Sequence, residues 1–318
     1  MVISYKKILE FFGYNSGPVA ALDISNTSVK ILQLSRLGAI ITIDHYAIEP
    51  LNNIIDATSV ITAIKAAILK SGIKTKKTCI SIGHEKVITK IITMAAVLDD
   101  KDIGNEIELE ASKYIPYPIA DMSIDYMVLK PQQNNSDTVD VLLVASKSAY
   151  VHDITSLVIA AGLQPVIVDV DTYAIARAFE FVTKNSLTAN CNKIFAIFDL
   201  GPNNISINIV RNGHVIYVRD QAFDETCQLT IEQQLVSLYK TVISMGLFEA
   251  VNDIYLIGNK SNIKDLDIII ENILQVKTFK LNVFANMLLA ANISQTEFAY
   301  DSLSLTKCSG LALINIMN

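Results

Sequence analysis

The sequence predicts a duplicated α/β fold, in which two similar halves enclose a cleft. An aspartate turn between two apolar strands occurs twice, at residues 19–34 around Asp23 and at residues 195–210 around Asp199. Asp199 follows Asp23 by 176 positions, and this offset also aligns the apolar residues of the second strands. A third apolar run follows each copy, at residues 40–43 and 215–218. Two such units far apart in one chain favour two related sheets whose aspartate turns face each other.

The composition is that of a globular protein with a large core. The chain has 318 residues, of which 51% are hydrophobic and 18% are charged, which excludes global disorder and is enough for about two domains. The net charge is −6 and no basic block occurs, so nucleic acid is not an expected partner.

The mean hydropathy is high, at +0.37. Polar residues nevertheless interrupt every apolar run before it reaches the length of about 18 residues that would cross a bilayer. Lys6, Lys7 and Glu10 interrupt the first apolar stretch, so no secretory signal is visible. We expect a cytoplasmic protein.

Cysteine and histidine give no metal-binding pattern. The four cysteines have no CxxC spacing and the four histidines are scattered along the chain. We therefore expect neither a metal site nor a disulfide framework.

The first part of the chain divides into an arm and the first half of the fold. Residues 1–17 form an N-terminal arm whose apolar residues could line one face of a short helix. This helix could contact a membrane surface or a partner, or it could pack on its own domain. Residues 18–77 form the first part of the first half, with a helix over residues 54–71 that ends at Gly72.

Residues 78–146 have a different pattern, typical of a small inserted α+β subdomain. Strands are expected at residues 78–82, 87–94, 122–129 and 140–145. Between them, Asp99 or Asp100 caps a helix that buries Ile103, Ile107, Ala111 and Tyr114. Its carboxylates, Glu106, Glu108 and Glu110, are two apart and so belong to a solvated face rather than to a metal site.

The rest of the chain returns to alternating helices and strands. Residues 147–168 return to the first half, with a helix at 149–161 and a strand at 166–170. Residues 169–318 form the second half, which begins with a helix capped by Asp171. After the second aspartate turn we expect helices at 235–245 and 263–274, strands at 254–257 and 277–283, and a C-terminal helix.

Four segments carry a resemblance to a known family. They read IELEASKYIPYP at 107–118, VLLVA at 141–145, AAGLQP with VDVD at 160–171, and NGHVIYVR at 212–219. In this order they resemble the PilM family, the cytoplasmic actin-like proteins of type IV pilus assembly, related in fold to the division protein FtsA. The resemblance covers residues 18–313. It implies an actin-like duplicated fold of two ribonuclease-H-like halves with a small inserted α+β subdomain.

The resemblance also implies a partner. Family members bind the cytoplasmic tail of PilN in a groove between the insert and the first half, which connects them to the PilN–PilO–PilP complex at the inner face of the inner membrane. We expect Tyr114, Pro116 and Tyr117 to contribute to this surface. The sequence does not decide whether the protein contacts pilus motor ATPases or whether it forms a homo-oligomer.

The nucleotide site implied by the resemblance is degenerate. Its expected members are two phosphate turns and one position on the adenosine side: Asp23, Ser25, Asn26, Lys30, Asp199, Gly201, Asn203 and Gly258. Ser25 stands where the family has glycine, and glycine permits a closer backbone approach to phosphate. Pro202 removes an N–H, Asn259 replaces a second glycine, and the subdomain that should cover the nucleotide is largely deleted near residues 224–235.

These departures favour a pilus-assembly scaffold with weak or lost ATP–magnesium binding, no catalytic residue and no cofactor. Two alternatives are an active actin-like ATPase of the same machinery and a divergent FtsA-like division protein. An ATPase must position a water molecule, and its acidic candidates, Asp169 and Asp171, fit a strand end and a helix cap equally well. An FtsA-like protein should have a long tail with an amphipathic helix, whereas this sequence stops at Asn318.

Overall fold

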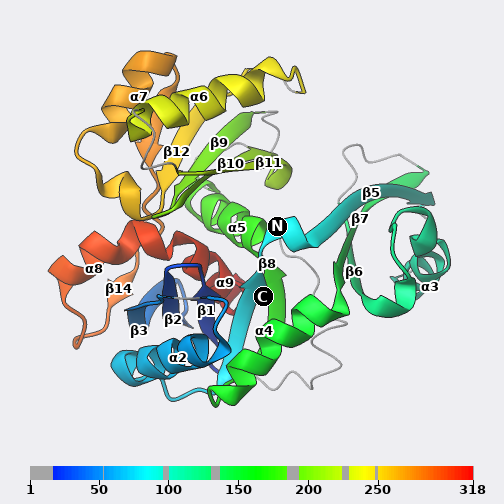
Figure 1. The fold of residues 1–318 in the computed structure, drawn as a ribbon, viewed down its shortest axis with the longest axis horizontal. Helices are drawn as coiled ribbons and strands as arrows, with labels where there is room; N and C mark the ends of the chain where they lie inside the picture. The colour runs from blue at the N-terminus through cyan, green and yellow to red at the C-terminus, as the bar shows by residue number, and fades with distance from the viewer. Residues whose placement is uncertain are drawn as a thin grey trace.

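The protein folds into two α/β halves with a smaller unit that stands to one side (Figure 1). The computed structural model describes residues 17–52, 54–95, 100–129, 137–184, 193–223, 229–247 and 250–317. The expected N-terminal arm and the connection at residues 224–228 lie outside these ranges. No helix of the described residues is both long and apolar enough to cross a membrane.

The first half is built on a six-stranded sheet with the order β14-β3-β2-β1-β4-β8. Its strands are β1 (Ala20–Ile24), β2 (Ser28–Leu37), β3 (Ile40–Pro50), β4 (Lys77–Ile82), β8 (Gln164–Val170) and β14 (Leu288–Leu289). Helices α2 (Ala57–Ser71) and α4 (Ser148–Ala160) pack on its outer face through a shared apolar cluster. The expected start of α2 at residue 54 is wrong, because the Asp56 side chain accepts hydrogen bonds from the Thr58 and Ser59 backbone and begins the helix there.

The second half repeats this plan. Its sheet has the order β11-β10-β9-β12-β13, with strands β9 (Ile194–Leu200), β10 (Asn204–Arg211), β11 (His214–Ala222), β12 (Asp253–Ile257) and β13 (Lys277–Lys280). In each half three antiparallel strands are followed by a strand parallel to the first, β4 on β1 and β12 on β9. The shared strand order confirms the duplication predicted from the two aspartate turns.

Two helices cover the outer face of the second sheet. They are α6 (Ile231–Ser244) and α7 (Leu266–Leu274). The expected start of α6 at residue 235 is wrong, because Thr230 and Gln233 form a capping box that begins the helix at Ile231. Residues 263–265 are likewise not helical: they follow the 3-10 turn η4 (Asn259–Asn262), and Asp265 has a left-handed backbone with φ +58°, so α7 begins at Leu266.

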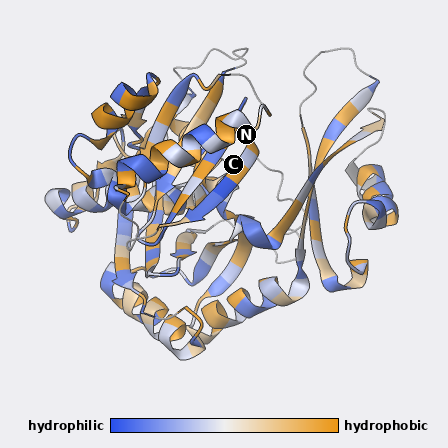
Figure 2. Ribbon diagram, turned by 45° about the horizontal axis from the view of Figure 1, so that its top comes forward, coloured by the Kyte–Doolittle hydropathy of each residue, from blue (hydrophilic) through white to orange (hydrophobic). Residues whose placement is uncertain are grey.

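The inserted unit is a three-stranded sheet with one helix. Its order is β5-β7-β6, with β5 (Val87–Ala95), β6 (Met122–Val128) and β7 (Thr138–Lys147). Figure 2 shows the long strands β5 and β7 running out from the body. Helix α3 (Asp100–Glu110) buries Ile103 and Ile107 on this sheet, as predicted, but ends before Tyr114, in a 3-10 turn at Ala111–Lys113.

Helices α5 (Asp171–Thr183) and α9 (Thr306–Met317) lie between the two sheets and share one apolar core with both. They cross at Gly310, where an added Cβ would collide with the carbonyl oxygen of Ala174. The buried Arg177 of α5 donates one hydrogen bond to Asp169 of β8 (2.8 Å) and one to the Gly310 carbonyl (2.9 Å). Asp169 is therefore a structural partner of Arg177.

The C-terminal segment differs from the expected organisation. Residues 169–318 were assigned to the second half, but β14 pairs with β3 of the first sheet. Cys308 of α9 likewise approaches the Ala21 and Lys30 carbonyls of β1 and β2. The short helix α8 (Gln295–Asp301) was not predicted. The end of the chain crosses back because the exposed edge of β3 and the inner face of the first sheet still need a covering layer.

We predict that Gly310→Ala destabilises the protein by about 1–3 kcal/mol, the usual cost of overpacking, although alanine is the better helix former. Chemical unfolding followed by circular dichroism measures this. Asn272→Ala, at an exposed position of α7, is the control and should leave stability unchanged. Equal stability of Gly310→Ala and the unaltered protein would show that the helix crossing has room to adjust.

Candidate functional site between the two halves

The two aspartate turns meet between the halves. Asp23 ends the buried part of β1 with only 1% of its surface exposed, and Asp199 takes the matching place near the end of β9. Each carboxylate is close enough to two lysines, Lys30 and Lys307, for their charges to shift its pKa. We call these four residues the aspartate–lysine cluster.

Strand register brings the first lysine to its place. Lys30 of β2 lies directly opposite Asp23 of β1, and its Nζ is 3.2 Å from Asp23 Oδ2. In the second half Ser206 lies opposite Asp199. The duplication therefore supplies a cation for one aspartate and a neutral hydroxyl for the other.

The second lysine was missed by the sequence analysis. Lys307 is in the first turn of α9, and its Nζ lies 3.4 Å from Asp23 Oδ1. Burial alone would lower its pKa, but the charges of Asp23, Asp171 and Asp199 outweigh burial and raise it. The sequence feature that could have indicated Lys307 is its isolation as the single charged residue among the small and apolar residues of 305–314.

The two carboxyl groups respond oppositely to the cluster. Burial raises the pKa of Asp23, but the ammonium groups of Lys307 and Lys30 outweigh burial and the net pKa is lowered. For Asp199 burial dominates, Asp23 and Asp171 add to it, and the pKa is raised. Asp23 is therefore the carboxyl group of the cluster that loses its proton more readily.

The other predicted members of the first turn hold its shape. Ser25 Oγ donates to the Ser28 carbonyl (3.0 Å) and accepts from the Ser28 N–H (3.2 Å). Its hydroxyl is therefore used within the turn. Asn26 is exposed at the tip.

In the second turn Gly201 lies against the Asn204 side chain, where a Cβ would be 2.5 Å from Asn204 Oδ1. Asn203 is exposed, and its carbonyl accepts from Phe223 N–H (2.8 Å). Gly258 lies directly against the aspartate–lysine cluster. It has φ +88°, and a Cβ there would be 2.6 Å from Asp199 Oδ1. A glycine is required at this close approach.

These residues do not fit a magnesium nucleotide well. Both oxygens of Asp23 already face a lysine, and the Ser25 hydroxyl is held within its turn. Gly258 N–H, a backbone donor beside Asp199, donates to the Leu303 carbonyl (2.9 Å). The Asp23 carboxylate, the Ser25 hydroxyl and the Gly258 N–H therefore already have partners within the protein.

A cavity lies elsewhere, between β3, the end of α2 and α8. Its volume is about 600 Å³, and its lining includes Tyr46, Lys70, Glu297 and Asp301. Burial, with the nearby Asp301 and Glu297, raises the pKa of Tyr46 to about 12. None of its lining residues belongs to the aspartate–lysine cluster.

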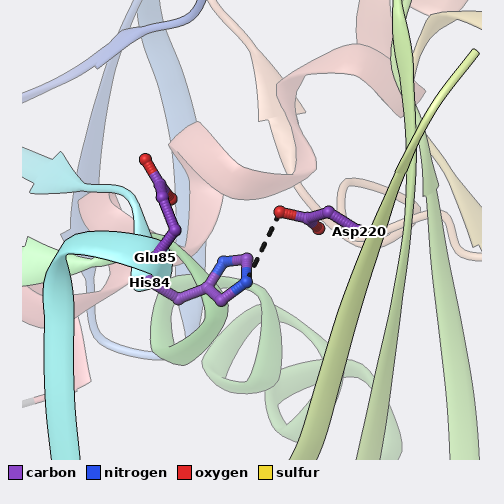
Figure 3. A group of neighbouring side chains, drawn as sticks. All are labelled: His84, Glu85 and Asp220. Carbon is purple, nitrogen blue, oxygen red and sulfur yellow. Dashed lines mark ion pairs between the residues drawn. The ribbon is translucent and has the colours of Figure 1, made fainter.

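A second charged group connects the halves around His84 (Figure 3). His84 is in the 3-10 turn η1 (His84–Lys86) after β4. Its Nε2 is 3.4 Å from Asp220 Oδ2 on β11, its Nδ1 is 3.6 Å from Asp171 Oδ1, and its backbone N–H donates to the same Asp171 oxygen (3.0 Å). The sequence does not indicate this group, because Asp171 and Asp220 are distant from His84 along the chain.

The ring is better suited to an ion pair than to a metal. His84, Glu85 and Asp220 offer ligand atoms within 4.8 Å of one another. Burial would lower the His84 pKa, but Asp171 and Asp220, with a smaller effect of Glu85, raise it overall. The carboxylates thus favour the protonated, ion-paired ring, and we call His84, Asp171 and Asp220 together the His84 bridge.

The predicted partner-binding residues separate into two kinds. Tyr114 packs against the core of the insert, whereas Pro116 and Tyr117 are exposed. Lys147, the residue before α4, places Nζ 4.4 Å from the Tyr117 ring centre and 5.9 Å from that of Tyr150, and Lys86 lies 4.9 Å from Tyr150. Tyr117, Lys147, Tyr150 and Lys86 form a lysine–tyrosine strip where the insert joins the first half.

We predict that the His84 bridge makes stability depend on pH. A raised folded-state pKa gives stabilisation that is fully present below the unfolded value of 6.5 and is lost as pH rises through the folded pKa. His84→Gln should therefore destabilise the protein more in mildly acidic than in alkaline buffer, as measured by urea unfolding. His152→Gln, at an exposed histidine of α4, should show no such difference. An equal loss at both pH values would assign His84 a packing role only.

Comparison with known proteins identifies the family. Residues 21–244 match the family model described as type IV pilus assembly protein PilM. The protein of the PilM–PilN type IV pilus biogenesis complex superposes with a TM-score of 0.77 at 18% identity, covering 95% of this chain and 99% of that one. The ethanolamine utilization protein EutJ from Carboxydothermus hydrogenoformans gives 0.52 at 11% identity, covering 95% and 91%. These similarities confirm the predicted actin-like fold, and the family match over most of the chain shows that it belongs to the PilM family of type IV pilus assembly proteins.

Proposed function

We propose that the protein is a scaffold of type IV pilus assembly that binds the cytoplasmic tail of PilN. The observation that carries this is the superposition, over nearly the whole of both chains, on the protein of a PilM–PilN complex. The family match over residues 21–244 supports the same role.

The lysine–tyrosine strip is the surface we assign to the tail. Tyr117 and Tyr150 are 44% and 37% exposed. Lys147 Nζ lies over both rings, so an ammonium group and two aromatic faces are already next to one another on this surface. Aromatic residues with a polar tip are common anchors at interfaces, and lysine donors suit the backbone carbonyls of an extended peptide.

Binding of the PilN tail would hold the protein next to the membrane. A protein that holds the PilN tail is peripheral to the inner face of the inner membrane and connects the PilN–PilO–PilP complex to the cytoplasm, where the pilus motor ATPases act. The lysine–tyrosine strip involves the insert and the first half. It therefore does not require a nucleotide between the halves.

The alternative function is that of an active ATPase, and the contacts of the aspartate–lysine cluster argue against it. Catalysis of phosphoryl transfer needs a metal ion and a positioned water. Here both Asp23 oxygens face lysines and Asp169 is bound to Arg177. Asp171 accepts from the backbone of Thr172 and His84. The two acidic candidates therefore have structural partners.

We predict that Tyr117→Ala weakens binding of a synthetic PilN tail peptide by about tenfold, the effect of losing one interface anchor. Isothermal titration calorimetry on the folded variant measures this. Tyr300→Ala removes a 73% exposed tyrosine from α8 and should leave peptide affinity unchanged. Unchanged affinity of Tyr117→Ala and Lys147→Ala together would refute the assigned surface.

We predict that Mg-ATP gives no saturable binding in the micromolar range, because the cluster already satisfies the groups that would hold its phosphates. Calorimetric titration of the intact protein measures this. Tight binding that disappears in Asp23→Ala would instead restore the ATPase reading.

A further inference from the structure

We propose that Lys307 is a built-in cation that takes the place of a divalent metal ion beside Asp23 and Asp199, so that this site is closed to metal until the lysine is removed. The inference deepens one part of the proposed function, the weak binding of magnesium nucleotide, and gives its cause. It holds whichever partner the lysine–tyrosine strip binds.

The geometry of Asp23 supports this assignment. Lys30 Nζ lies 3.2 Å from Oδ2, and Lys307 Nζ lies 3.4 Å from Oδ1, so each oxygen of the carboxylate faces a different ammonium group. The carboxylate is almost fully buried, with 1% of its side chain exposed. A metal ion would have to displace one of the two lysines to reach an Asp23 oxygen.

The surroundings of Lys307 show that the carboxylates hold it in place. Its side chain is 18% exposed, and removing an ammonium group from water costs free energy. This cost is offset because Asp23, Asp171 and Asp199 act on the same group. The role of Lys307 therefore lies in the cluster.

Charge balance gives the reason why metal is excluded. Asp23 and Asp199 are the carboxylates of the cluster, and Lys30 and Lys307 are its two ammonium groups, so these four balance when all are charged. The third carboxylate that acts on Lys307, Asp171, is itself paired with His84. A divalent ion would leave an excess of positive charge in a site largely removed from water. Without Lys307, the carboxylates exceed the remaining lysine by one charge, and carboxylate oxygens are the ligands that Mg²⁺ and Mn²⁺ prefer.

A difference between the two halves also supports the role of Lys307 as a substitute for a metal ion. The position equivalent to Lys30 is Ser206, which leaves Asp199 without a cation on its own sheet. Lys307 comes from α9, which packs on the first sheet, yet its charge acts on Asp199 of the second. The lysine therefore joins the two halves electrostatically in the place where a bound metal would otherwise do so.

The test is the metal response of Lys307→Met, a variant of nearly equal length without the charge. After chelator treatment, thermal unfolding is followed with and without millimolar MnCl₂, and bound Mn²⁺ is counted by electron paramagnetic resonance. The unaltered protein should show no change in Tm and no bound ion. Lys307→Met should have a lower Tm in chelator, and Mn²⁺ should raise this Tm saturably because a ligand specific for the folded state stabilises it.

Two matched variants control the result. Lys280→Met removes a lysine whose Nζ is 3.8 Å from Asp267, at a partly exposed site, and should gain no metal response. Lys307→Met combined with Asp199→Asn should lose the response. If Lys307→Met does not fold, Lys307→Gln is measured in its place.

The proposal is overturned if the folded Lys307 variants do not respond to Mn²⁺, or if the unaltered protein binds Mn²⁺ and loses it in Asp23→Asn. Its failure is distinct from failure of the proposed function. Tight Mg-ATP binding by the unaltered protein would refute the weak nucleotide affinity, and unchanged peptide affinity in the Tyr117 and Lys147 variants would refute the partner surface.

Discussion

The close crossing of α5 and α9 is the constraint on which the rest of the structure depends. Gly310 lets the helices touch backbone to backbone, and Arg177 joins Asp169 of β8 to the Gly310 carbonyl at the same point. Both sheets pack on this helix pair through one continuous core. The crossing therefore fixes where the aspartate turns meet, and it sets the start of α9, with Lys307, beside them.

A series of charged side chains extends from Lys307, at the start of α9, to β11. Asp171, the first residue of α5, acts on Lys307 on one side and accepts from the His84 backbone on the other. His84 then reaches Asp220 on β11. Carboxylates and cations thus alternate from the first sheet to the second. Charge pairs between its own side chains therefore connect the two halves of this protein.

The sequence predicted the parts of this design that repeat or that follow local rules. The aspartate turns revealed the duplication and so located Asp23 and Asp199, and the apolar periodicity of Ile103 and Ile107 indicated the helix of the insert. Helix starts were misplaced where a cap such as Asp56 or Thr230 decided them. Lys307 and the partners of His84 were missed because tertiary packing brings them together, and the return of α9 to the first sheet follows from an edge and a face that only the folded sheet has.

One short turn connects the two surfaces to which we assign roles. In η1, His84 faces Asp171 and Asp220 between the halves, while Lys86, two residues later, lies over the Tyr150 ring of the lysine–tyrosine strip. The turn is closed by a hydrogen bond from Lys86 N–H to the Gly83 carbonyl (3.0 Å), and Ser146 of β7 donates to the Lys86 carbonyl (2.9 Å). The hydrogen-bonded backbone of this one turn therefore places His84 between the halves and Lys86 on the lysine–tyrosine strip.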